Sequence, residues 1–295
     1  MVLLNDLYTA YGELLVRKNV EITPDIVRQV RGRGERHEEV RVPMKNSDIF
    51  KDFVEVFDDP RYKTMFESPA APIEICNAAG KLMIENDILF ELSNMKRNLP
   101  YTFRHVLIVA AFGIKMSLVL KKNRYSEEIV THCGFTHDLG KTRIPIPILE
   151  KEGRLTRQEL EVIKTHPIIG YLLLNYYLKS DRIECSLASL EHHEKLDGSG
   201  YPKGLNRLTK YTQLISPIDI MDALMTNRPY RQKVFSLRAS LDYLLQEARE
   251  GRLNAEVVYA LISLARKGKP PISSMKISKE AREGLPEDLA HEKFL

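Results

Sequence analysis

From about residue 73 to residue 267, apolar side chains recur at helical spacing and no convincing strand alternation interrupts them. In the segment 101–121 a single helical face carries His105, Val109, Phe112 and Met116. Further helices are expected to begin at capping residues or at a proline, namely Ser126, Thr156, Pro167, Asp181, Ser236 and Asn254. The pattern predicts a mainly α-helical protein.

The first 80 residues differ from the rest. Thr23 and Pro24 predict the start of a short helix, and the charged stretch 31–39 predicts a solvated loop. The stretch 67–72 predicts a loop at a domain boundary. We therefore expect three parts. Residues 1–80 would form a small N-terminal accessory domain, α or α+β, with a regulatory role. A helical domain over 81–268 and a poorly ordered tail over 269–295 would follow.

Composition bounds the partners. The 295 residues include 44 basic and 40 acidic side chains, and the net charge of +4 is too small to argue for a nucleic-acid polymer. Cys76, Cys133 and Cys185 form no CxxC pair, which predicts reduced thiols and a cytoplasmic protein. No apolar run approaches the roughly 20 residues of a membrane helix, so no membrane partner is expected.

The histidines and two of the aspartates are the candidate functional residues. Six of the eight histidines lie between residues 105 and 193, and the pair His137-Asp138 stands shortly before Gly140. Asp219 lies within an apolar run, where a carboxylate is usually paired or bound to a metal. Neutral imidazoles and carboxylates together suit a first-row transition metal.

The same residues also allow purely structural interpretations. The pair His137-Asp138 could be a polar helix end, Asp219 a buried ion pair, and His105 a core histidine. Three further histidines are interpreted as core or surface residues without a metal: His37, His132 and His291.

Two loops suit an anionic ligand. Tyr201 lies between Gly200 and Pro202, and a tyrosine held in a glycine-rich loop can stack on a base or bond a phosphate. Arg228 and Arg231 flank a rigid Pro-Tyr and suit a bidentate phosphate clamp, with an exposed basic turn as the alternative.

The motifs are far more specific together than singly. In order they are His105, His137-Asp138-x-x-Lys141, His166-Pro167-x-x-Gly170, His192-His193-Glu194, Asp197-Gly198-Ser199-Gly200-Tyr201-Pro202, Asp219-x-x-Asp222-Ala223-Leu224 and Arg228-Pro229-Tyr230-Arg231. This series, over 101–264, resembles the HD-GYP family of bacterial cyclic-dinucleotide phosphodiesterases, a branch of the HD-domain metallohydrolases. The resemblance implies an HD-type helical bundle around a metal centre, and it leaves residues 1–80 outside.

The resemblance also implies two divalent metal ions, iron first and manganese as the competitor. A third metal in some members is held by a glutamate at the position of Tyr101, so two ions are expected here. The implied ligands of the first ion are His105, His137, Asp138 and Asp219. Asp138 would bridge to the second ion, completed by His166, His192 and His193.

The implied activity is hydrolysis of cyclic di-GMP to pGpG, GMP or both, by attack of a hydroxide that bridges the metals. Asp138 and Lys141 would be catalytic, and the implied substrate contacts are Lys141, Tyr201, Arg228 and Arg231. The alternatives are hydrolysis of pGpG or cyclic GMP-AMP, and a receptor that binds the nucleotide with little turnover. A homodimer or another partner could form through the N-terminal domain.

Overall fold

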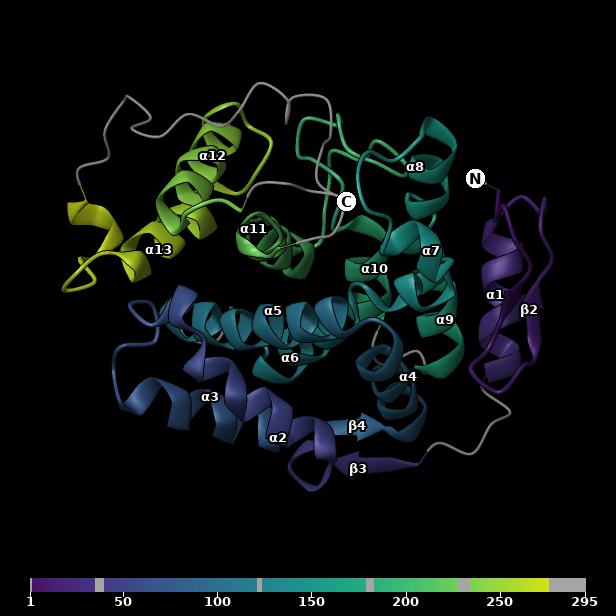
Figure 1. The fold of residues 1–295 in the computed structure, drawn as a ribbon, viewed down its shortest axis with the longest axis horizontal. Helices are drawn as coiled ribbons and strands as arrows, with labels where there is room; N and C mark the ends of the chain where they lie inside the picture. The colour runs from purple at the N-terminus through teal and green to yellow at the C-terminus, as the bar shows by residue number, and fades with distance from the viewer. Residues whose placement is uncertain (1, 35–39, 121–123, 179–182, 228–233, 276–295) are drawn as a thin grey trace.

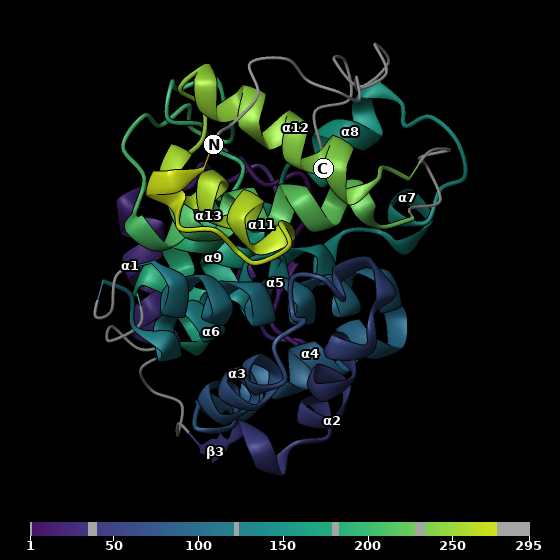
Figure 2. The same ribbon diagram turned by 90° about the vertical axis from the view of Figure 1, so that its left-hand side faces the viewer.

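The computed structural model describes residues 2–34, 40–120, 124–178, 183–227 and 234–275. Within these ranges the chain is mainly α-helical, as predicted, and α5 (Pro100–Val119) runs through its middle (Figure 1). Both views place α11 (Lys210–Met225), α12 (Leu237–Arg249) and α13 (Ala255–Ala265) on one side of α5, and α2 (Asp48–Val54) and α3 (Ala70–Gly80) on the other (Figures 1 and 2). The remaining α-helices are α1 (Pro24–Gly34), α4 (Asn86–Asn98), α6 (Glu127–Thr136), α7 (Ile146–Leu149), α8 (Arg157–Ile163), α9 (His166–Tyr177) and α10 (Ile183–Glu191).

Helix α5 is apolar on nearly every face, and a helix of that kind is buried. Its 20 residues are long and apolar enough to cross a membrane by length and composition alone. It is thus the exception to the expectation that no apolar run approaches that length. However, 72% of the window that passes this test is buried inside the protein, where α3, α4, α6, α11 and α13 pack on the helix.

Local capping explains where the helices begin. Ser126, Ser236 and Asn254 cap α6, α12 and α13 through their side chains, and Thr156 forms a complete capping box on α8. Pro167 lies in the first turn of α9, where it needs no hydrogen-bond partner. These predicted starts are confirmed; the predicted cap Asp181 lies outside the described residues.

The N-terminal segment packs beside α9. Two short strands, β1 (Leu7–Tyr8) and β2 (Leu14–Val16), pair antiparallel, and α1 contacts α9. The prediction of a loop from residue 31 is wrong, because α1 continues to Gly34. Arg33 donates to the carbonyls of Leu14 and Leu15, and these bonds hold the last turn in place. Residues 35–39 of that prediction lie outside the described part of the chain.

A second strand pair joins residues on either side of the predicted boundary. Strand β3 (Arg41–Pro43) pairs antiparallel with β4 (Met83–Glu85), whose three residues are too short to show alternation in the sequence. The predicted loop over 67–72 is wrong from Ala70 onward, because α3 starts there and its first turn tolerates Pro72. Short 3₁₀ turns lie between some of these elements. Three precede α3, namely η1 (Met44–Asn46), η2 (Glu55–Asp58) and η3 (Pro60–Tyr62), and η4 (Leu139–Arg143) follows α6.

Buried apolar side chains form one connected core that extends from Leu3 to Leu264. It takes in the N-terminal strands as well as the helices around α5. The division at residues 80 and 268 stays a prediction. In the predicted tail, the short turn η6 (Ile272–Ser274) is the last described element, and residues 276–295 lie outside the described part.

Candidate metal centre

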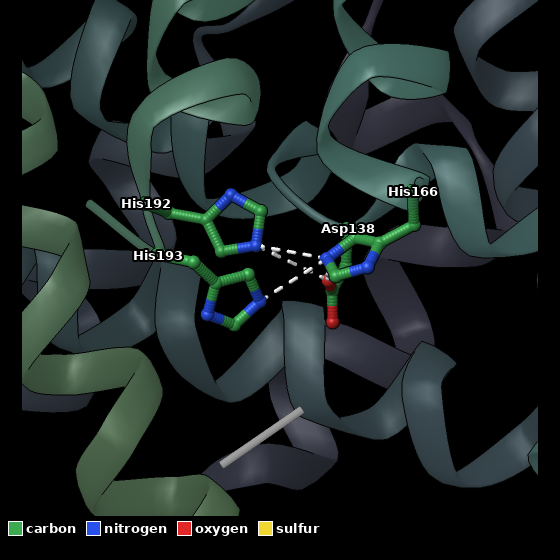
Figure 3. Close-up of side chains that lie close together, drawn as sticks. All are labelled: Asp138, His166, His192 and His193. Carbon is green, nitrogen blue, oxygen red and sulfur yellow. Dashed lines mark hydrogen bonds and ion pairs between the residues drawn. The ribbon is translucent and has the colours of Figure 1, made fainter. Parts of the chain in front are cut away.

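Seven of the predicted site residues meet in the middle of the bundle. His105 lies on α5, His137 and Asp138 follow α6, and Asp219 lies on α11. The other three are His166, at the start of α9, and His192 and His193, directly after α10. Figure 3 shows Asp138 and the last three histidines pointing toward one another.

The buried side chains form two groups that share one carboxylate. In each group, one possible ligand atom per residue lies within 4.8 Å of those of the other members. The first group is His105, His137 and Asp138, and the second is Asp138, His166, His192 and His193. Asp219 adds a second carboxylate beside the first group, with Oδ1 3.1 Å from His105 Nε2 and 4.0 Å from His137 Nε2.

The two oxygens of Asp138 face different groups. Oδ2 lies 3.7 Å from His105 Nε2 and 3.8 Å from His137 Nε2. Oδ1 lies 3.3 Å from His166 Nε2 and 3.6 Å from His192 Nε2, and within the described residues it has no hydrogen-bond partner. A buried carboxylate oxygen without a hydrogen bond is costly unless a cation lies beside it.

Hydrogen bonds to the backbone set the tautomers of three imidazoles. The Nδ1 atoms of His137, His166 and His192 lie 2.9, 2.7 and 2.8 Å from the carbonyl oxygen three residues earlier in the chain. A carbonyl only accepts, so each Nδ1 carries the proton. In the neutral ring, Nε2 then presents a lone pair to the middle of the site.

The Nε2 atoms of neighbouring histidines lie close together. His137 Nε2 lies 3.3 Å from His105 Nε2, and His166 Nε2 lies 3.1 Å from His192 Nε2 and 3.2 Å from His193 Nε2. The unprotonated Nε2 atoms of His166 and His192 cannot hydrogen-bond to each other, but they can bind the same cation. With metal–nitrogen bonds of about 2.1 Å, neighbouring ligands lie roughly 3.0–3.4 Å apart. The side chains therefore fit a metal ion in each group.

The electrostatics suit metal binding as well. Burial lowers the pKa of His137 to about 3 and that of His166 to about 4, so both rings are neutral near pH 7. Burial acts to raise the pKa of the Asp138 and Asp219 carboxyl groups. The positive charge of Lys141 beside Asp138, and the hydrogen bond from His105 to Asp219, outweigh burial and hold each pKa well below its usual range. Neutral imidazoles and ionised carboxylates are the protonation states that bind metal.

His105 differs from His137 and His166. Burial alone would lower its pKa, but hydrogen bonds with Asp219 and Asp222 outweigh burial and raise it to about 9. Without a metal the ring is therefore a cation held between two carboxylates. A metal ion at Nε2 would take the place of that proton.

Two glycines allow the supporting elements to approach so closely. A Cβ on Gly134 of α6 would lie 2.4 Å from Ala110 Cα of α5. A Cβ on Gly140 would lie 2.0 Å from the carbonyl oxygen of His166. Real Cβ atoms essentially never approach within 3.0 Å, so larger residues would separate the elements that carry the candidate ligands.

The predicted substrate residues lie around this centre as far as they are described. Lys141 is 5% exposed and its Nζ lies 2.7 Å from Asp138 Oδ2. The ring of Tyr201 stacks on His193, with centroids 4.8 Å apart and planes at 15°. Arg228 and Arg231 lie outside the described residues. Tyr101, at the position of the third-metal glutamate, is 53% exposed.

Sequence reasoning gave no role to Asp222, whose Oδ2 accepts from His105 Nδ1 at 2.6 Å. Its position three residues after Asp219 in a helix was the available signal, because such residues share a face. His132 is a buried core histidine, as interpreted, and it bonds Glu85 at 2.8 Å. His37 and His291 lie outside the described residues.

Residues 86–257, more than half of the chain, match the HD domain family. The cyclic di-GMP phosphodiesterase response regulator RpfG of Xanthomonas campestris is 39% identical over 153 residues, which cover 49% of this chain and 40% of that protein. A cyclic di-GMP phosphodiesterase of Thermotoga maritima is 37% identical over 194 residues, which cover 61% and 50%. The 3'3'-cGAMP-specific phosphodiesterase 1 of Vibrio cholerae is 31% identical over 164 residues, which cover 55% and 37%. The chain thus spans half or less of the length of these relatives.

Proposed function

The chain belongs to the HD domain family, in its HD-GYP branch, and on that premise we propose that it is a metal-dependent phosphodiesterase that hydrolyses cyclic di-GMP to pGpG, GMP or both. The observation that carries this proposal is the shared carboxylate: Asp138 faces two groups of buried imidazoles, and the Nε2 atoms within each group lie close together. Paired sites of this kind are typical of enzymes that cleave phosphate esters.

We propose two ions, iron first and manganese as the competitor. His105, His137 and Asp219 would hold one ion, and His166, His192 and His193 would hold the other, with Asp138 shared between them. Divalent ions held there supply Lewis-acid activation of the phosphodiester and of the water that attacks it. Mixed nitrogen and oxygen ligands accept either metal.

The chain's own residues orient the imidazoles and neutralise charge at the centre. Backbone carbonyls hold three of the imidazoles in the tautomer that leaves Nε2 free. Lys141 balances the charge of Asp138 and is close enough to the centre to donate to a phosphoryl oxygen. Tyr201, fixed against His193, would contact the dinucleotide, and Arg228 and Arg231 would bind its second phosphate.

The names of the relatives support cyclic di-GMP as the substrate, with cyclic GMP-AMP as the second candidate and pGpG as a third. A receptor with little turnover is disfavoured, because all seven ligand positions carry a metal-binding side chain. We also propose a cytoplasmic location, in keeping with three cysteines in the thiol form. The N-terminal segment is our candidate for contacts with a second copy or another protein.

The test is turnover by protein loaded anaerobically with Fe²⁺ or Mn²⁺, measured on cyclic di-GMP, pGpG and cyclic GMP-AMP. His166→Gln should abolish hydrolysis, whereas His132→Gln changes an equally buried histidine outside the centre and should retain bound metal and activity. Hydrolysis of none of the three nucleotides by protein that holds two ions would contradict the proposal, and tight nucleotide binding in that case would identify a receptor.

A further inference from the structure

The carboxylate of Asp222 connects a metal-centre histidine to a part of the chain outside the family match. Its Oδ2 lies 2.6 Å from His105 Nδ1, and its Oδ1 accepts from the Tyr62 hydroxyl at 2.5 Å. All three side chains are buried. Tyr62 belongs to η3, whereas the match to the HD domain family begins at residue 86.

This arrangement gives Nδ1 of His105 a different partner from Nδ1 of three other histidines of the centre. Nδ1 of His137, His166 and His192 faces a neutral carbonyl, but Nδ1 of His105 faces a carboxylate. A carboxylate behind a ligating imidazole fixes the ring and increases its basicity toward the metal. The strength of His105 as a ligand therefore depends on where the Asp222 carboxylate lies and how much of its charge is neutralised.

Tyr62 acts on both of these properties. Its hydroxyl occupies the oxygen of Asp222 that His105 does not use, so the carboxylate plane is fixed from both ends. Arg61 Nη1 lies 3.4 Å from the same oxygen and adds positive charge. Without the hydroxyl, that oxygen would turn toward Arg61, and the oxygen on the other side would move relative to His105.

The η3 turn is itself firmly attached to the bundle. Asp59 caps it and accepts hydrogen bonds from Arg61 and from Arg104 of α5. The ring of Tyr62 packs edge-on against Phe112 of α5, with centroids 4.9 Å apart. The turn therefore has a fixed position relative to the helix that carries His105.

Arg61 extends the same attachment to the end of α11. It donates to the carbonyl of Met225 at 3.1 Å and to the Thr226 hydroxyl at 2.7 Å. In the sequence these two residues shortly precede Arg228 and Arg231, the proposed phosphate contacts. The η3 turn thus contacts Asp222, which hydrogen-bonds His105, and also the end of α11, which precedes the two arginines in the sequence.

We propose that Tyr62 is a positioning residue for the metal centre: through Asp222 it orients His105 and sets the affinity of the ion that His105 binds. The proposal rests on the proposed function, because it takes His105 as a ligand. It predicts that Tyr62→Phe weakens one ion and leaves the other unchanged. Loss of such an outer partner typically reduces metal affinity by about 10- to 100-fold, and we expect about tenfold here.

The experiment is titration of the metal-free full chain with Co²⁺, followed by the visible absorption of the bound ion and by calorimetry. Tyr177→Phe is the matched control, because it also removes a buried hydroxyl that donates to a carboxylate, Glu91, but away from the centre. Wild type and Tyr177→Phe should each bind two Co²⁺ ions. The affinity of each ion should be the same in the two proteins. Tyr62→Phe should bind one ion normally and the other about tenfold more weakly, with a changed absorption band.

A second variant guards against an uninformative result. Asp222→Asn keeps the shape of the side chain that contacts His105 but removes its charge. It should reduce the affinity of the same ion by at least as much as Tyr62→Phe. Unchanged Co²⁺ affinities in Tyr62→Phe, or equal losses in Tyr62→Phe and Tyr177→Phe, would overturn the positioning role while leaving the proposed function intact. A wild-type chain that binds no Co²⁺ would overturn both.

Discussion

Replacing Gly134 by alanine tests whether close approach of α6 to α5 builds the metal centre. The added methyl group would lie 2.4 Å from Ala110 Cα and 2.7 Å from Ala110 N, whereas ordinary contacts begin at 3.4 Å. Because the nearest atoms are helix backbone, no side-chain rotation relieves the clash. The helices must separate by about 1 Å, which moves His137 away from His105.

The magnitude follows from two opposing terms. Overpacking costs about 1–3 kcal/mol, and backbone contacts this short favour the upper end. Alanine in a helix interior is more favourable than glycine by about 1 kcal/mol. We therefore expect Gly134→Ala to lose about 2 kcal/mol. Gly32 of α1 is the matched control, because a Cβ there meets nothing within 4 Å, and Gly32→Ala should gain up to about 1 kcal/mol.

The assay is urea unfolding followed by circular dichroism, together with the number of ions bound per chain. Gly134→Ala should unfold at a lower urea concentration than wild type and bind the His105 ion more weakly, whereas Gly32→Ala should do neither. If Gly134→Ala were stabilised as much as Gly32→Ala, the close approach would not determine the geometry of the centre and the reasoning would be refuted.

Four further predictions concern the centre and its surroundings. Asp138→Ala should lose both ions and all turnover together, as measured by elemental analysis and nucleotide assay; one retained ion would contradict a shared ligand. Arg228→Ala should mainly raise KM with kcat little changed, and an unaltered KM would remove the clamp assignment. Metal analysis should give two ions per chain, and three would contradict the interpretation of Tyr101. Burial would raise the pKa of Asp59, but hydrogen bonds from Arg61 outweigh it and hold that pKa at about 2. This ion pair should therefore stabilise the fold above about pH 4 and be lost as the pH falls toward 2, so the urea midpoints of wild type and Asp59→Asn should converge over that range.

Local signals explain what the sequence predicted. Helix starts depend on a few adjacent residues, so the caps at Ser126, Thr156, Ser236 and Asn254 could be identified. The seven predicted ligands fall in short motifs, and the structure brings them together. Their roles as ligands remain a prediction.

The rest depended on contacts between distant segments. Tyr62 and Asp222 are 160 residues apart, and His132 and Glu85 are 47 apart, so no local pattern reveals either pair. The helical end of α1 was missed for the same reason, because Arg33 finds its carbonyl partners in β2. Tertiary contacts of this kind override local loop signals.

The sharing of Asp138 has a consequence for how such a protein responds to its surroundings. If catalysis requires both ions, activity follows the doubly loaded fraction of the protein, and at low metal supply this fraction falls with the square of the free ion concentration. The shared oxygen pair also prevents the two loading equilibria from being independent. A cell short of transition metal would therefore lose the proposed hydrolase activity sooner than it loses the protein's bound metal.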